Sequence, residues 1–186
     1  MTENEQKMLL TIARQSIAYG LQNGQPGLVN VSKVPVALLT PAASFVTLKF
    51  GAKLRGCVGS IKPVRPLAQD VATNAFLAAF KDARFPPLTP EELDTTTIDI
   101  SILSELEPID YDSEEDLLEK IRPGIDGLVI QENEQRGLFL PCVWESLPNK
   151  DMFFKQLKIK AGLPFNYWSD NLLCWRFTVE MIKESN

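Results

Sequence analysis

The residues best suited to chemistry lie in one run of six, Leu54-Arg55-Gly56-Cys57-Val58-Gly59. The thiol of Cys57 is a soft nucleophile, and the guanidinium of Arg55 carries a permanent charge on a planar set of donors. Glycine weakens the interior of a strand, so Gly56 and Gly59 indicate a bulge or a close approach of another group to the backbone. This run is therefore our candidate site.

Cys57 has two interpretations. As a catalytic residue, it would act as a thiolate favoured by the positive charges of Arg55, Lys53 and Arg84. As a structural residue, it would be a small buried apolar group, as free cysteines commonly are. The chain contains no histidine, which excludes a Cys-His dyad within it, and whether the protein is an enzyme stays open.

The same basic side chains could instead bind an anion. Arg55, Lys53 and Arg84 would supply positive charge, while Gly56 and Gly59 would let backbone N–H groups approach a phosphate or a carboxylate. This ligand-binding site would need no thiol chemistry.

Two internal ion pairs compete with such an anion site. Arg55 could pair with a carboxylate such as Asp99 or Asp126. In the segment Asp82-Ala83-Arg84-Phe85-Pro86-Pro87, a contact between the aspartate and the arginine would make the loop rigid. We favour the rigid loop over the wall of a cleft, because the prolines already restrict the backbone there.

The totals narrow the class of protein. Cys57, Cys142 and Cys174 are widely spaced and form no Cys-x-x-Cys pair, which argues against a disulfide framework, a metal site and a bound cluster. We predict no metal and no cofactor. The polar N-terminus lacks the pattern of a signal peptide, and no apolar run reaches the ~18 residues of a membrane-spanning helix. We expect a cytoplasmic protein without a membrane partner.

Charge is divided unevenly along the chain, whose formal net charge is −5. Residues 6–69 contain eight basic and no acidic residues, whereas residues 70–186 contain 11 basic and 22 acidic ones. Either the fold has a basic face, suited to an acidic protein or a nucleic acid, or the two parts interleave and neutralise each other. The negative net charge argues against nucleic acid, which we keep as an alternative.

Periodicity predicts an α+β fold with a mostly antiparallel sheet flanked by helices. The strand patterns at 44–50 and 54–61 are joined by a tight turn and predict a hairpin. In 95–103, isoleucines alternate with polar residues, as in an antiparallel strand with one buried face. The other expected elements are helices over 3–22, 66–82, 89–93, 113–121 and 150–161, a second hairpin over 125–140, and a strand over 172–180.

The orientation of the candidate side chains depends on alternation within the first hairpin. Strict alternation places Arg55 and Cys57 on one face of the sheet, with Leu54 and Gly56 on the other. A bulge at Gly56 or Gly59 would break this pattern. The sequence does not decide whether such a bulge is present.

Several runs together resemble the AMMECR domain family. The run Leu54–Gly59 is similar to the six-residue signature of that family. The other matching runs, in family order, are Phe45-Val46-Thr47-Leu48, Arg65-Pro66-Leu67, Asp82-x-Arg84-Phe85-Pro86-Pro87-Leu88, Ile98-Asp99-Ile100-Ser101, Ile121-Arg122-Pro123-Gly124-x-Asp126-Gly127-Leu128, Phe139-Leu140-Pro141-x-Val143-Trp144 and Ala161-Gly162-Leu163-Pro164. Val58 departs from the usual isoleucine, and Cys142 stands where a polar residue is common.

The resemblance implies one AMMECR domain over residues 1–186, with a larger lobe that contains an antiparallel sheet and helices, and a smaller lobe. The two lobes would be interleaved in sequence. Prokaryotic members are called AmmeMemoRadiSam system protein A. Their association with Memo-type and radical S-adenosylmethionine proteins implies a protein partner, but the family has no settled biochemical activity.

Three functions follow from these observations. The first is an adaptor or accessory subunit that acts with Memo-type and radical S-adenosylmethionine proteins. The second is an enzyme that uses Cys57 and Arg55 in a cleft, on an anionic small molecule or a protein substrate. The third is a nucleic-acid-binding regulator.

Overall fold

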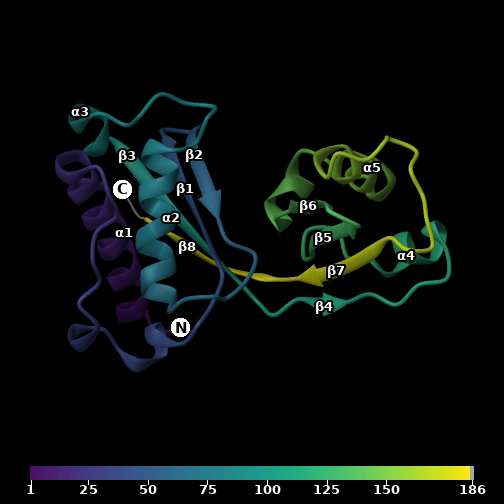
Figure 1. Cartoon of the computed structure of the whole chain (residues 1–186), viewed down its shortest axis with the longest axis horizontal. Coiled ribbons are helices and arrows are strands. Elements are labelled where there is room, and N and C mark those ends of the chain that lie inside the picture. Colours follow the sequence, from purple (N-terminus) through teal and green to yellow (C-terminus); the bar gives the residue numbers. More distant parts are fainter. Residues whose placement is uncertain (185–186) are drawn as a thin grey trace. The chain divides into compact units, whose positions relative to one another are not determined.

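The computed structural model describes residues 1–184, and its chain forms two units, each with its own four-stranded antiparallel sheet (Figure 1). Unit 1 contains residues 1–103 together with the C-terminal residues from Glu180. Unit 2 is the segment Ser104–Val179. The expected α+β class with antiparallel strands is confirmed.

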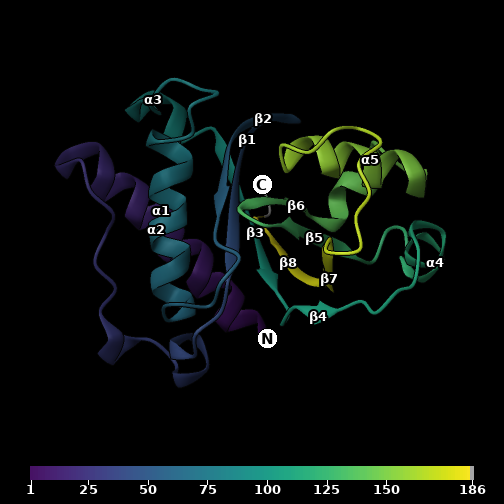
Figure 2. The same ribbon diagram turned by 45° about the vertical axis from the view of Figure 1, so that its right-hand side comes forward.

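Unit 1 has its helices on one face of its sheet, whose strand order is β2-β1-β3-β8. In both Figure 1 and Figure 2, α1 and α2 lie on the same side of this sheet. The elements are α1 (Glu3–Asn23), η1 (Val31–Lys33), η2 (Val36–Leu39), β1 (Ser44–Phe50), β2 (Lys53–Gly59), α2 (Leu67–Phe80), α3 (Pro90–Leu93), β3 (Thr96–Leu103) and β8 (Val179–Lys183).

Local sequence fixes both ends of α1. At its start, the side chains of Thr2 and Glu5 bond each other's backbone N–H groups in a capping box. At its end, Gly24 has a φ of 67°, the left-handed conformation that glycine adopts without steric cost. The helix predicted over 3–22 is therefore present, with boundaries set by these caps.

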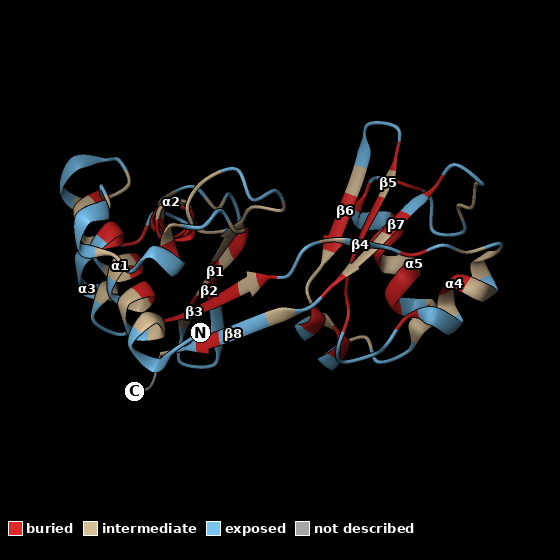
Figure 3. Ribbon diagram, turned by 90° about the horizontal axis from the view of Figure 1, so that it is seen from below, coloured by how far each residue is buried: buried red, intermediate tan, exposed pale blue. Residues whose placement is uncertain are grey.

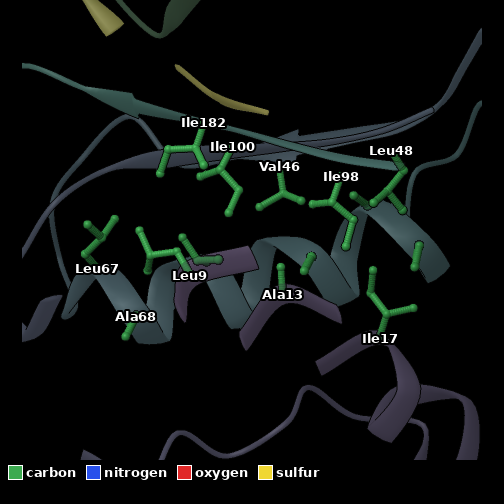
Figure 4. Packing of buried hydrophobic residues seen from close by; sticks show 14 of the residues in the cluster. Leu9, Ala13, Ile17, Val46, Leu48, Leu67, Ala68, Ile98, Ile100 and Ile182 are labelled. Carbon is green, nitrogen blue, oxygen red and sulfur yellow. The ribbon is translucent and has the colours of Figure 1, made fainter. Parts of the chain in front are cut away.

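The core of unit 1 lies between its two long helices and the sheet. Leu9, Ala13 and Ile17 recur on one face of α1 and are completely buried. Figure 4 shows these side chains with α2 and the aliphatic residues of the sheet. Alternate residues of β1 and β3 point into this layer, so the intervening residues lie on the sheet face opposite the helices.

A fully buried carboxylate, Asp70, joins the first turn of α2 to the start of β1 and to the segment just after β2. It accepts hydrogen bonds from the backbone N–H of Ser44 at 2.9 Å, the hydroxyls of Ser44 and Ser60 at 2.7 and 2.8 Å, and the amide of Asn74 at 2.9 Å. Arg65 Nε donates at 2.9 Å and balances the charge. These bonds offset the large cost of burying a carboxylate.

Unit 2 packs its helices against a sheet with strand order β4-β7-β5-β6. Its elements are β4 (Glu107–Pro108), α4 (Glu114–Lys120), β5 (Gly127–Glu132), β6 (Gln135–Phe139), η3 (Pro141–Glu145), α5 (Lys150–Lys160) and β7 (Leu173–Phe177). Figure 3 shows buried positions concentrated on its strands and on one side of α5.

Two contacts centre the core of unit 2. The rings of Trp144 and Phe153 stack with centroids 3.6 Å apart, and the indole N–H of Trp144 donates to the carbonyl oxygen of Asp126 at 2.7 Å. The completely buried Lys158 ammonium bonds Glu114 at 2.7 Å and the carbonyl oxygen of Tyr167 at 2.9 Å.

Within residues 1–184, no helix combines the length and apolar character that crossing a membrane requires.

We expect Asp70→Ala to destabilise the protein by about 3–5 kcal/mol, because it leaves the half-buried Arg65 and several buried donors without their hydrogen-bond partner. Urea unfolding followed by circular dichroism would measure the loss as a lower midpoint at unchanged slope. The control, Glu3→Ala, removes the exposed Glu3–Lys7 pair on α1 and should shift the midpoint far less. Equal shifts for the two variants would contradict the role given to Asp70.

Candidate functional site

The candidate run lies on β2, and a bulge at Arg55 interrupts it. Leu54 pairs with Lys49 of β1 and Gly56 pairs with Leu48, which leaves Arg55 without a partner on the neighbouring strand. Strict alternation is therefore wrong at this point. The bulge lies at Arg55 and not at Gly56 or Gly59, and it gives Arg55 and Cys57 separate surroundings.

The two glycines of the run are required by close packing within unit 1. A Cβ at Gly56 would lie well under 3.0 Å from the backbone oxygen of Ala78 in α2, a separation that real Cβ atoms essentially never show. A Cβ at Gly59 would meet the ring of Phe45 equally closely. The close approach predicted for these positions is made by the chain's own helix and side chain.

Arg55 forms a two-point ion pair with Glu92 of α3. Its Nε and Nη2 atoms donate to the two carboxylate oxygens at 2.9 and 2.8 Å, and Nη2 also donates to the carbonyl oxygen of Pro86 at 3.0 Å. The hydrogen bond from Arg55 lowers the pKa of Glu92 to about 2, and Glu92 in turn raises the pKa of Arg55. Nη1 is buried and has no hydrogen-bond partner within residues 1–184.

The partners considered for Arg55 in the sequence analysis were wrong. Asp99 pairs with Lys49 at 2.5 Å, and Asp126 pairs with Arg122 at 2.6 Å in unit 2. Glu92 lies 37 residues after Arg55, in a four-residue helix, and no periodic signal connects the two. A capping box at Thr89 marks that helix in the sequence but not the use of its glutamate by β2.

Asp82 and Arg84 cover the open edge of β2 at Cys57. Asp82 accepts a hydrogen bond from the backbone N–H of Cys57 at 2.9 Å, and Arg84 Nη2 donates to its carbonyl oxygen at 3.3 Å. The two side chains also pair with each other at 2.9 and 2.7 Å, which confirms the predicted Asp–Arg contact. Arg84 is the main reason that the pKa of Asp82 lies far below its usual range.

The Cys57 side chain belongs to a row of polar groups on the sheet face opposite the helices. Register places Cys57, Thr47 and Asp99 side by side on β2, β1 and β3. The Thr47 hydroxyl donates to the half-buried sulfur at 3.3 Å, and Lys49 Nζ bonds Asp99. We call these four residues the thiol row. The sequence did not reveal Thr47, Lys49 and Asp99 as neighbours of Cys57, although alternation within β1 and β3 places their side chains on one face of the sheet.

The basic residues near the start of the chain are largely neutralised within it. Five of the eight basic residues in 6–69 form ion pairs, namely Lys7–Glu3, Arg14–Glu184, Lys49–Asp99, Arg55–Glu92 and Arg65–Asp70. The interleaving interpretation of the charge split therefore describes the fold. The predicted site residue Lys53 is exposed at the start of β2.

The described residues, 1–184, offer little for metal or thiol chemistry outside the thiol row. No three histidine, cysteine or acidic side chains in this part of the chain converge as a metal site would require. Cys57, Cys142 and Cys174 take part in no disulfide within residues 1–184. Burial raises the pKa of Cys174 to about 12, which leaves it protonated and unreactive at neutral pH.

The substitution Gly56→Ala should lower the free energy of unfolding by about 3 kcal/mol or more. The new methyl group would meet the backbone of α2, and neither β2 nor α2 can move without disturbing the core. Gly24→Ala provides a contrast, since open space surrounds that position and only its positive φ is unfavourable. That variant should cost about 1 kcal/mol. Thermal unfolding of both variants would check this order, and a reversed order would show that the strand–helix approach at Gly56 is not tight.

The Arg55–Glu92 pair should make stability depend on pH. Because the pKa of folded Glu92 is depressed, its contribution is present above the unfolded value of about 4.5 and is lost as pH falls through about 2. We expect Glu92→Gln to lower the unfolding free energy by about 1 kcal/mol at pH 7, after allowance for partial exposure. The gap from wild type should close by pH 2. A constant gap would contradict the ion pair, and Glu115→Gln serves as an exposed control.

Known proteins resemble this chain along almost its whole length. The AMMECR1 family model matches residues 10–182. A protein of Thermofilum pendens is 33% identical and covers 100% of this chain and 92% of its own, and one of Thermotoga maritima is 40% identical over 76% and 78%. The crystal structure of the uncharacterized protein PH0010 from Pyrococcus horikoshii has a TM-score of 0.90 at 30% identity, covering 97% of this chain and 92% of that one. The chain belongs to the AMMECR1 family.

Proposed function

We propose that this protein is an interaction module, an adaptor or accessory subunit that acts with Memo-type and radical S-adenosylmethionine proteins. The observation that carries the proposal is the use of the signature side chains inside unit 1. Arg55 is paired with Glu92, and Arg84 is paired with Asp82 across the edge of β2. These ion pairs stabilise the fold of unit 1. An anionic substrate could bind Arg55 only by displacing Glu92, and Arg84 only by displacing Asp82.

The segment that joins α1 to β1, residues 24–43, is the surface we assign to the partner; we call it the crossover segment. Its apolar side chains Leu28, Val31 and Val36 are 91%, 60% and 81% exposed. Single exposed apolar residues are common, but three within nine residues of one segment make the apolar patch that an interaction surface needs. The segment contains no acidic residue, which favours a partner surface that is apolar and acidic.

A second candidate function is a thiol enzyme centred on the thiol row. The Thr47 hydroxyl at 3.3 Å from the Cys57 sulfur, beside the Lys49–Asp99 pair, is the observation that favours it. Cys57 would act as the nucleophile, with Lys49 as a binding group for an anionic substrate. Nucleic-acid binding has less support, because five of the eight basic residues in the first third are already paired.

The double variant Val31→Asp/Val36→Asp should weaken binding to the partner by about tenfold or more, because it places charge in the centre of an apolar contact. Calorimetric titration against purified Memo-type and radical S-adenosylmethionine proteins from the source organism would measure this. Val64→Asp, at an exposed apolar position outside the crossover segment, is the matched control and should bind normally.

Cys57→Ser separates the two candidates in cells that lack the gene. The adaptor should complement fully with serine at this position, whereas a thiol enzyme should lose its activity. Loss of complementation by a stably folded Cys57→Ser protein, or normal partner binding by the double aspartate variant, would contradict the adaptor. Binding to nucleic acid that falls steeply with salt would favour the regulator instead.

A further inference from the structure

A pocket of about 570 Å³ lies within unit 1, between α1 and the crossover segment. Its apolar lining comes from Met8, Ile12, Tyr19, Leu28, Val29 and Val34. Thr11, Gln15, Asn30 and Lys33 add a small number of polar groups. A pocket of this volume, with mostly apolar walls and few polar groups, has the character of a small-molecule site.

The pocket is held open by specific contacts. The buried hydroxyl of Ser16 donates to the carbonyl oxygen of Ala72 at 2.6 Å and accepts from the N–H of Gly27 at 3.0 Å, which fixes the crossover segment against α1 and α2. Farther along, Asn30 caps η1 through the N–H of Ser32 at 3.2 Å, and Val34 packs against the core. Residues 27–30 and 33–34 of the crossover segment line the pocket together with residues of α1.

The charge of the pocket has one sign. No acidic residue lines it, and the stretch from 6 to 69, which supplies all its walls except Ala72, contains none. Lys33 is exposed at the pocket and takes part in none of the ion pairs formed by residues 1–184. An apolar cavity with a single available cation is complementary to a ligand that has an apolar body and one negative charge.

We propose that this pocket binds a small amphipathic anion with an aliphatic body and a single carboxylate or similar head group. The aliphatic part lies against Met8, Ile12 and Val34, where the flexible thioether of methionine adapts to different chains. The head group pairs with Lys33. This binding activity goes beyond the adaptor function and does not depend on it. Leu28 belongs to both surfaces, but Val31 and Val36, which the partner-binding test alters, do not line the pocket.

Three probes that share a ten-carbon chain test the charge preference, at concentrations below micelle formation: decanoate, decanol and decyltrimethylammonium. Titrations followed by amide chemical shifts should show saturable binding of decanoate, with the shifts centred on α1 and the crossover segment. Decanol should bind more weakly and the cation least. Lys33→Ala should weaken decanoate binding by about two- to fivefold, as loss of one exposed ion pair does, and leave decanol unchanged. Lys62→Ala, another exposed lysine, is the control.

A blocking variant tests the location. Thr11 is exposed on α1 and lines the pocket, so Thr11→Trp should fill the space and weaken decanoate binding by at least about tenfold while the helix remains folded. Gln22→Trp places the same side chain at an exposed position of α1 outside the pocket and should bind like wild type.

Several outcomes would overturn the proposal. These are no saturable binding of decanoate, equal affinity for decanoate and the cation, shifts centred outside the pocket, or normal binding by Thr11→Trp. If the probes fail to bind but Thr11→Trp loses the protein partner, the space is part of a protein-docking surface and holds no small ligand.

Discussion

The position of the signature strand depends on the buried carboxylate of Asp70. Asp70 holds the start of β1 through Ser44 and the segment just after β2 through Ser60, so the open end of the hairpin is fixed to α2. The strand then passes so close to this helix that only glycine fits at position 56. Near the other end, the Arg55–Glu92 pair joins the bulge to α3. Hydrogen bonds to Asp70, close packing at Gly56 and the Arg55–Glu92 ion pair together fix the position of β2 relative to α2 and α3.

This fixation explains why residues suited to chemistry occur together without forming an evident catalytic centre. An arginine in a bulge and an Asp–Arg pair along the strand edge stabilise the hairpin, and the edge pair also occupies backbone groups that another strand could otherwise bond. Only the Cys57 side chain turns away from this packing, toward Thr47 on the opposite face. The packing role accounts for Arg55, Gly56, Gly59 and Arg84, and it does not account for the thiol of Cys57.

Sequence patterns predicted what depends on neighbours in the chain. The alternating isoleucines of 95–103, the hairpin and the capped first helix follow from local rules and are present. The bulge at Arg55 escaped prediction because it is a property of two strands in register. The long-range bonds of Glu92 and Asp70 were not predicted, because a carboxylate in the first turn of a helix already has a local explanation. Its favourable interaction with the helix dipole does not indicate a partner that is distant in sequence. The pocket was not predicted, because the crossover segment shows no periodic pattern of apolar residues from which its path could be inferred.

The two candidate surfaces of unit 1 lie on different sides of its sheet, which makes their functions separable. The thiol row occupies the face opposite the helices, since its members alternate with the buried residues of β1 and β3. The crossover segment is fixed to α1 on the helical side through Ser16 and Gly27. Substitutions more than about 10 Å apart with no shared partners act almost independently. No described contact links the crossover segment directly to Cys57. A loss of function caused only by substitutions in the crossover segment therefore indicates a role in partner recognition, and a loss caused only by substitution of Cys57 indicates a chemical role for the thiol.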